Sequence, residues 1–231
     1  MMHIVKDIFR TFYPYAIFTL PSPLPSGEGR GEAAQCAYLT FDDGPIPEVT
    51  PHVLAILDRY SVKATFFMVG ENIDKHPDLF AQVLAAGHSV GNHTYNHLKG
   101  WRTPYADYMA NVHLWKQAAQ RPLSAEGGLS AQRSILDQRS GLFRPPYGKA
   151  TLRQRRAIHQ FGYRLIYWDV LTRDYEATRT PEQMFAQIKR ETRPGSIINF
   201  HDSLKSNERM LAVLPQAIDW LLQQGYTLLP L

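Results

Sequence analysis

Residues 37–45 read Ala-Tyr-Leu-Thr-Phe-Asp-Asp-Gly-Pro, an apolar run that leads into two adjacent carboxylates and a Gly-Pro turn. Gly44 and Pro45 end the predicted strand sharply, which leaves the side chains of Asp42 and Asp43 at its C-terminal end. Two ionised aspartates side by side repel each other, so a fold that keeps them places a cation nearby or gives them different roles. The same sequence is also ordinary turn chemistry, so its meaning depends on the rest of the chain.

Outward from this stretch, short apolar runs alternate with amphipathic segments of ten or more residues. The runs predict strands over 37–41, 62–69, 88–91, 142–144, 163–168, 196–200 and 226–229, and the segments predict helices over 48–60, 73–86, 104–119, 149–161, 181–192 and 207–224. Gly87 and Gly162 follow two of these helices as C-terminal caps, and Pro181 sits in the first turn of another. The alternation predicts a parallel sheet with crossover helices. Seven units favour a closed or nearly closed barrel, with an open doubly wound sheet as the alternative.

The N-terminal part differs in composition from the remainder. Residues 15–18, Tyr-Ala-Ile-Phe, predict a short strand, whereas 21–35 are rich in Pro and Gly and are not expected to form a core. We therefore divide the chain into residues 1–36, a strand with a Pro/Gly-rich loop, and residues 37–231, one domain. Within that domain the polar segment 121–141 is expected to be an inserted loop.

The 231 residues have the composition of a soluble globular protein, with 44% hydrophobic residues, 20% charged residues and a net charge of +4. The basic stretch formed by Arg153, Arg155 and Arg156 has helical spacing and predicts a solvated helix face, so no nucleic-acid partner is expected. The single cysteine, Cys36, predicts a small core residue and no intrachain disulfide. No apolar run reaches the ~20 residues of a membrane span, and no convincing signal peptide is present. The expected location is the cytoplasm, with export as the alternative.

Polar side chains follow most of the predicted strands. They are Asp42 and Asp43 after the first strand, His93 and His97 after the third, Arg144 after the fourth, Asp169 and Asp174 after the fifth, and His201 after the sixth. The C-terminal ends of the strands of a parallel barrel meet at one rim, where active sites are built. These side chains are therefore expected to lie together.

His93 and His97 are four residues apart, which on a helical turn places both imidazoles on one face. Together with a carboxylate on the same rim they predict a three-ligand metal site with open positions, as in catalytic zinc sites. Zn²⁺ is the expected ion, and cobalt, nickel, iron or manganese would accept the same ligands. The histidines away from the rim are expected to be surface or packing residues: His52, His76, His88, His113 and His159.

Taken together, these motifs resemble the NodB-type polysaccharide deacetylases, carbohydrate esterase family 4, from about residue 37 to residue 229. Residues 41–45 (Phe-Asp-Asp-Gly-Pro), 93–97 (His-Thr-Tyr-Asn-His) and 144–148 (Arg-Pro-Pro-Tyr-Gly) are similar to the first three family motifs. The resemblance implies an α/β fold, a distorted (β/α)7-8 barrel. It also implies that Asp43, His93 and His97 bind the metal.

The resemblance further implies a set of catalytic roles. Asp42 would be the general base that takes a proton from the attacking water, and Arg144 would hold that base in place and ionised. His201 would be the general acid that protonates the leaving amine, with Asp174 as the partner that raises its pKa. Asp169 is expected to be structural. The backbone N–H of Tyr147 would stabilise the tetrahedral oxyanion.

Two positions depart from the family pattern. Tyr175 stands where the fourth motif usually has tryptophan, and Asn199 stands where the fifth usually has leucine. In the family both side chains help to form the apolar pocket for the acetyl methyl group. Tyr175 is still able to pack against a methyl group, whereas the polar Asn199 fits that pocket less well.

The expected function is metal-dependent removal of N-acetyl groups from the amino sugars of a peptidoglycan- or chitin-like glycan. One alternative keeps the chemistry and changes the substrate to O-acetyl esters or small cyclic amides. Another is an inactive carbohydrate-binding barrel. The sequence leaves the glycan and the oligomeric state open.

Overall fold

The structure is a computed structural model that describes residues 15–20, 35–121 and 141–231. The segments 1–14, 21–34 and 122–140 lie outside these residues, and they contain nearly all of the two expected loops. The predicted loops at 21–35 and 121–141 therefore stay predictions.

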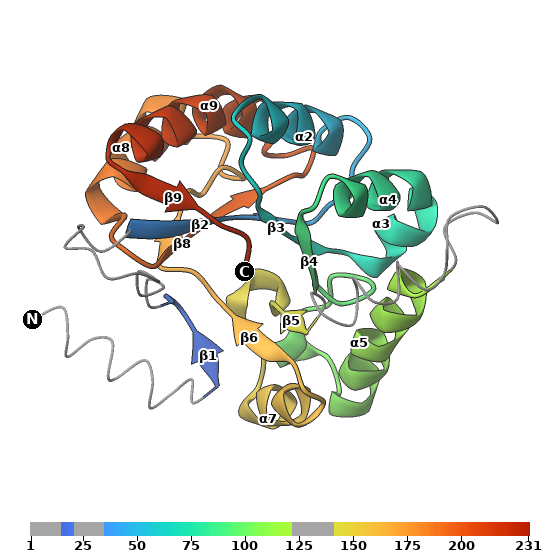
Figure 1. The fold of residues 1–231 in the computed structure, drawn as a ribbon. Coiled ribbons are helices and arrows are strands. Elements are labelled where there is room, and N and C mark those ends of the chain that lie inside the picture. Colours follow the sequence, from blue (N-terminus) through green and yellow to red (C-terminus); the bar gives the residue numbers. More distant parts are fainter. Residues whose placement is uncertain (1–14, 21–34, 122–140) are drawn as a thin grey trace, which may run out of the picture.

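One parallel sheet runs through the described residues, with nine strands in the order β1-β6-β5-β4-β3-β2-β8-β7 and β9 paired to β2 (Figure 1). The strands are β1 Ala16–Ile17, β2 Gln35–Asp42, β3 Thr65–Met68, β4 Ser89–Asn92, β5 Leu142–Phe143, β6 Arg164–Ile166, β7 Val170–Leu171, β8 Ser196–His201 and β9 Tyr226–Leu228. The described strands β1 and β7 end the sheet and do not pair with each other, although one antiparallel bridge joins Thr19 to Ser196. The sheet is thus curled into an open barrel, which confirms the predicted α/β barrel class.

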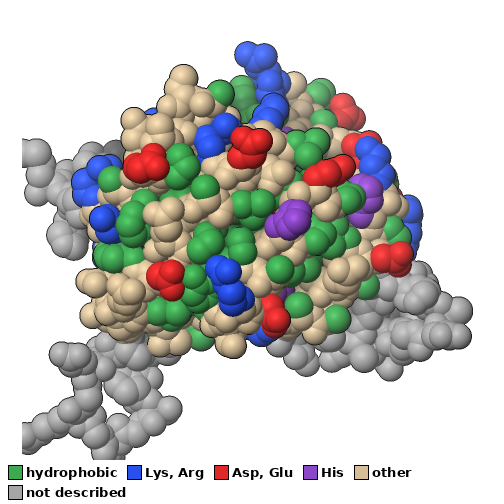
Figure 2. Space-filling view, turned by 90° about the horizontal axis from the view of Figure 1, so that it is seen from above, with side chains coloured by type: hydrophobic (Ala, Val, Ile, Leu, Met, Phe, Trp, Pro, Cys, Tyr) green, Lys and Arg blue, Asp and Glu red, His purple; other side chains and the backbone are tan. Residues whose placement is uncertain are grey.

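The helices form an arc around the outside of the sheet (Figure 1). They are α2 Thr50–Arg59, α3 Gly70–Lys75, α4 Pro77–Ala85, α5 Tyr105–Ala119, α7 Leu152–Gln160, α8 Pro181–Glu191 and α9 Asn207–Gln223, with 3-10 turns η1 Gly100–Arg102 and η2 Pro146–Gly148. Seen from above, acidic and basic side chains are interspersed among apolar ones on the face shown in Figure 2. Among the described residues no helix is both long and apolar enough to cross a bilayer.

The two faces of β2 have different roles. Phe41 points toward the helices and stacks between Phe66 of β3 and Phe200 of β8, with ring centroids 5.1 and 5.7 Å apart. Side chains alternate along a strand, so the residues on either side of Phe41, Thr40 and Asp42, point to the barrel interior. Both are buried, and their side chains form hydrogen bonds there. The apolar outer face holds the fold together while the inner face carries polar groups to the rim.

Several predicted boundaries are confirmed. Gly87 and Gly162 end α4 and α7 with φ of 80° and 87°, a conformation that costs glycine little, and Pro181 occupies the first turn of α8. The predicted N-terminal strand is β1, which adds to the same sheet through β6. Because β2 begins at Gln35, the division placed after residue 36 falls inside a strand.

Other details of the sequence prediction are wrong. The predicted helix 73–86 is two helices, because Pro77 has no N–H to continue α3 and instead begins α4. The two-residue strand β7 was missed, since so short a segment carries no periodicity. Arg155, expected on a solvated face, is only 6% exposed, whereas Arg153 and Arg156 are exposed as predicted.

Candidate active site

The predicted site residues lie at the C-terminal ends of the central strands. Asp42 ends β2 and lies opposite His201, which ends β8, in the parallel register of the two strands. His93 follows β4 directly, and Arg144 follows β5 directly. Residues up to 159 positions apart in the sequence therefore meet at one rim of the barrel.

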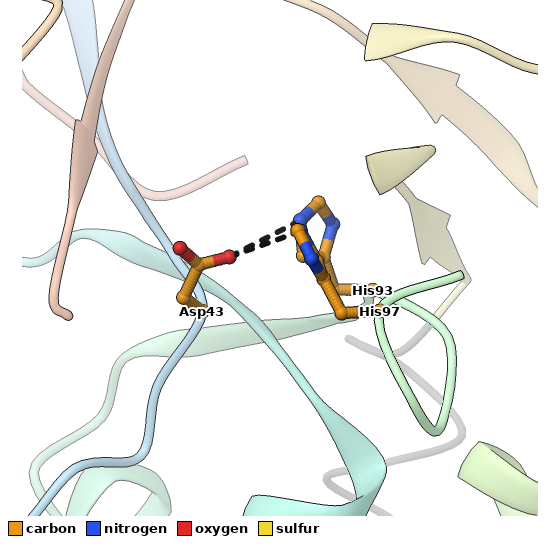
Figure 3. A group of neighbouring side chains, drawn as sticks. All are labelled: Asp43, His93 and His97. Atoms are coloured by element: carbon orange, nitrogen blue, oxygen red, sulfur yellow. Dashed lines mark ion pairs between the residues drawn. The ribbon is translucent and has the colours of Figure 1, made fainter. Parts of the chain in front are cut away.

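Asp43, His93 and His97 form a compact group whose possible ligand atoms all lie within 4.8 Å of one another. Asp43 Oδ1 lies 3.2 Å from His97 Nε2 and 3.7 Å from His93 Nε2, and the carboxylate faces both rings (Figure 3). His93 Nδ1 donates to the carbonyl of Arg144 over 2.8 Å. That hydrogen bond leaves the Nε2 lone pair of His93 directed at Asp43.

The spacing of His93 and His97 predicts that they share a helical turn, and this prediction is wrong. Residues 93–97 are irregular backbone, and Thr94 and His97 have positive φ of 62° and 53°. Asp43 and Tyr147 also adopt positive φ, at 87° and 58°. Such conformations cost a non-glycine residue on the order of 1–3 kcal/mol and persist where the surroundings over-determine them. Two of the three predicted metal ligands, Asp43 and His97, thus have strained backbones.

This group of side chains fits a divalent cation. Burial lowers the pKa of His93 to about 4 and also lowers the pKa of His97, so both imidazoles favour the neutral form with a free lone pair. Buried Asp43 Oδ1 has no hydrogen-bond partner among the described residues. Oxygen and nitrogen lone pairs that face one another repel unless a cation lies between them.

Asp42 is buried and held through both carboxylate oxygens. Arg144 Nη1 donates to Oδ1 over 2.7 Å, and Asn199 Nδ2 donates to Oδ2 over 3.1 Å. Burial alone would raise the pKa of Asp42, but the charge and hydrogen bond of Arg144, together with the charge of His201, outweigh burial and hold that pKa below its ordinary value. Asp42 is therefore kept ionised in the interior.

The side chain of Asn199 is hydrogen-bonded through both its oxygen and its nitrogen. Besides its bond to Asp42, its Oδ1 accepts from Arg144 Nη1 over 2.6 Å and from Thr40 Oγ1 over 3.1 Å, and the residue is fully buried. The polar residue that fits an acetyl pocket poorly is thus part of the hydrogen-bond network around Asp42. The expected place of Asn199 beside the acetyl group stays a prediction.

His201 is paired with Asp174, as predicted. His201 Nδ1 and Asp174 Oδ1 are 2.8 Å apart, and the backbone N–H of His201 donates to Asp174 Oδ2 over 2.7 Å. Burial alone would lower the pKa of His201, but the charge and hydrogen bond of Asp174 raise it to about 9. The ring of Tyr175 lies edge-on to His201, with centroids 5.0 Å apart, and is 40% exposed.

Tyr147 packs against His97 of the metal group. Its ring centroid is 4.6 Å from that of His97 and 5.6 Å from that of Trp101, and its side chain is half exposed. Tyr147 follows two prolines, which have no backbone N–H, so it is the first residue after them that is able to donate one. The oxyanion role of this N–H stays a prediction.

The remaining predicted residues have structural surroundings. Asp169 binds Ser196 Oγ, the N–H of Ile197 and the guanidinium of Arg193. His88 is buried, and its Nδ1 accepts from the N–H of Ala64. The structural expectation for both side chains agrees with these contacts.

Sequence reasoning missed one buried carboxylate at the rim. Asp202 accepts from the N–H of Gly44 over 3.0 Å and from Thr50 Oγ1 over 2.7 Å. Burial raises the pKa of Asp202 to about 8, although its hydrogen bonds with Thr50 and Gly44 oppose this shift. Its position directly after His201 at a strand end was the available signal.

The fold and the site together define a class: an α/β barrel with a candidate metal centre, formed by one carboxylate and two histidines, at its C-terminal rim. The chain belongs to the polysaccharide deacetylase family, whose profile matches residues 29–166. It is 33% identical over 210 residues to a chitooligosaccharide deacetylase of Azorhizobium caulinodans, with 84% of this chain and 91% of that relative covered.

Solved structures show the same fold. A peptidoglycan N-acetylglucosamine deacetylase in complex with a benzamide ligand has a TM-score of 0.80 at 26% identity, covering 96% of this chain and 94% of that one. A pseudoenzyme of carbohydrate esterase family 4 from Bacillus anthracis has a TM-score of 0.75 at 21% identity, covering 94% of this chain and 68% of that one.

Proposed function

We propose that this protein is a metal-dependent hydrolase that removes N-acetyl groups from the amino sugars of a glycan. The observation that carries the proposal is that two adjacent aspartates have different surroundings. Asp43 faces two histidines in a group suited to a divalent cation, while Asp42 is ionised and hydrogen-bonded to Arg144. Zn²⁺ is the ion we expect, because two imidazoles and one carboxylate are typical of catalytic zinc sites.

Asp43, His93 and His97 would hold the ion. A bound divalent cation lowers the pKa of water to about 7 and polarises a carbonyl oxygen. Asp42 would accept the proton of the attacking water, since its carboxylate is ionised and lies next to Asp43 in the chain. Arg144 and Asn199 orient the carboxylate so that it does not rotate away.

His201 would protonate the leaving amine. A general acid must carry its proton before the step, and the raised pKa of His201 provides that at neutral pH. Asp174 fixes the ring through Nδ1, so Nε2 is the atom left to donate. The N–H of Tyr147 would stabilise the developing oxyanion.

The similar deacetylases support an amide substrate on a sugar. The curated relative carries the name of a chitooligosaccharide deacetylase, and the solved relative that of a peptidoglycan N-acetylglucosamine deacetylase. We therefore propose N-acetylglucosamine-containing oligomers as the substrate class.

Acetate release from N-acetylated glucosamine oligomers and from peptidoglycan tests this function. We expect activity from the metal-loaded protein, loss on treatment with chelator, and recovery on adding Zn²⁺. Asp42→Asn keeps the shape of the base and should lower kcat by about 10²–10⁴-fold, with the metal content unchanged. Full activity in Asp42→Asn would overturn the assignment of the base. Turnover of acetyl esters or cyclic amides alone would move the function to those substrates, and glycan binding without any turnover would make the protein a binding barrel.

A further inference from the structure

A second carboxylate, that of Asp202, lies outside the proposed catalytic set and is hydrogen-bonded to the backbone next to Asp43. Asp202 and Thr50 are both fully buried, and neither contributes to the metal group or to the His201 pair. They are joined by a 2.7 Å hydrogen bond from Thr50 Oγ1 to Asp202 Oδ2. Two buried polar side chains paired across 152 positions of sequence need an explanation.

Their hydrogen bonds converge on the turn that follows β2. Asp202 Oδ1 accepts from the N–H of Gly44 over 3.0 Å, and the N–H of Asp202 donates to the carbonyl of Asp42 over 3.0 Å. Thr50 Oγ1 accepts from the N–H of Ile46 over 2.8 Å. The clamp formed by Asp202 and Thr50 therefore binds the chain on both sides of Asp43.

Gly44 shows how closely the clamp fits. A Cβ atom at Gly44 would lie 2.0 Å from Asp202 Oδ2 and 2.6 Å from Asp202 Cγ, so only glycine allows the carboxylate to reach this backbone. The motif glycine is thus required for the approach of Asp202 as well as for the turn.

Asp43 itself needs such support, because its φ of 87° is unfavourable for a residue with a side chain. Its remaining backbone groups are also occupied: its N–H donates to the carbonyl of Phe67 over 3.2 Å, and its carbonyl accepts from Asn72 Nδ2 over 2.8 Å. The strained conformation directs the carboxylate at His93 and His97, as Figure 3 shows.

We infer that Asp202, through Gly44 and together with Thr50, is a positioning residue that holds Asp43 in the geometry required to bind the metal. This inference rests on the proposed function, since it concerns the same metal group. Asp202 acts through the backbone and touches neither the ion nor the substrate. Loss of an outer hydrogen-bond partner of a metal ligand typically lowers metal affinity about 10–100-fold.

The test measures Zn²⁺ affinity by competition with a chromophoric chelator, with no substrate present. Asp202→Ala, which removes the acceptor for the N–H of Gly44, and Thr50→Val should each raise the dissociation constant about 10–100-fold. Thr50→Ser keeps the hydroxyl and should bind as the wild type does. Asn72→Ala, in a half-buried position on α3, removes the other side-chain hydrogen bond to this turn and should also weaken binding.

Thr65→Val is the matched control, because Thr65 is a buried threonine whose hydroxyl accepts from the N–H of Leu231 and does not bind the turn. It should lower thermal stability while leaving Zn²⁺ affinity unchanged. Wild-type affinity in Asp202→Ala and Thr50→Val would show a merely structural role and overturn the inference alone. Absence of Zn²⁺ binding in the wild type would overturn the proposed function and the inference together.

Discussion

At the scale of single residues, the pair His201 and Asp174 sets the protonation state of the proposed general acid. A pKa of about 9 means that His201 is protonated at neutral pH and loses its proton as the pH rises through that value. The rate should therefore fall on the basic side near pH 9. Asp174→Asn removes the negative charge that raises the pKa of His201. We therefore expect the basic limb of the pH profile of kcat to move to lower pH.

A matched control is available on a neighbouring strand end. Asp169→Asn alters a carboxylate bound to Ser196 and Ile197 rather than to His201, so it should leave the basic limb unmoved. A limb that stays in place in Asp174→Asn would remove Asp174 from its proposed role.

Substitution of Asn199 is expected to change both the stability of the fold and the pKa of Asp42. Asn199→Leu restores the residue usual in the family but removes a donor to Asp42 and an acceptor for Arg144. The free energy of unfolding should fall by about 1–3 kcal/mol, as expected when buried polar partners are lost. Loss of a hydrogen bond to the ionised form raises a carboxyl pKa, so the acidic limb of the pH–rate profile should move to higher pH.

Urea unfolding and pH–rate profiles check both effects. Ile198→Val, on the adjacent position of β8, faces the apolar cluster instead and should cost about 0.5–1.5 kcal/mol without moving the acidic limb. An unmoved limb in Asn199→Leu would mean that Arg144 alone keeps Asp42 ionised.

At the scale of elements, α8 begins with a side-chain cap and a proline in its first turn. Thr180 Oγ1 accepts from the N–H of Gln183, and Gln183 Oε1 accepts from the N–H of Thr180, which together form a capping box. Thr180→Ala should lower the free energy of unfolding by about 0.5–2 kcal/mol. Thr180→Ser keeps the hydroxyl and should retain most of the stabilisation that the cap provides. Acetate release should stay at the wild-type level in both variants, because Thr180 is exposed and outside the site. Equal stability of the two variants would show that the cap contributes nothing.

At the scale of the whole molecule, the metal group joins the loop after β2 to the loop after β4. An ion that binds only the folded state stabilises it by about 2.7 kcal/mol at a hundred times its dissociation constant. For a chain of this size each kcal/mol raises Tm by roughly 2–4 °C. Zn²⁺ added to chelator-treated protein should therefore raise Tm by roughly 5–10 °C in calorimetry. His97→Ala should abolish the increase, and an equal increase in that variant would place the ion elsewhere.

The sequence alone determined the barrel class and the positions of the chemistry. Alternating apolar runs and amphipathic segments carry the strand and helix order, because a buried parallel strand must be apolar and a covering helix must be two-faced. Asp42, Asp43, His93 and Arg144 could be placed at one rim because parallel strands bring their C-terminal ends together. Local rules also explain Pro77, whose missing N–H separates α3 from α4 although the pattern suggested one helix.

Only the tertiary structure decided how those side chains are used. Asn199 contacts Asp42 and Arg144 because the pairing of β2 with β8 directs its side chain into the interior. Asp202 accepts a hydrogen bond from Gly44, 158 positions away in the sequence, and no local sequence pattern predicts that bond. Periodicity reports which face of an element is apolar, whereas hydrogen bonds and pKa shifts depend on distances between elements that are established only when the sheet curls.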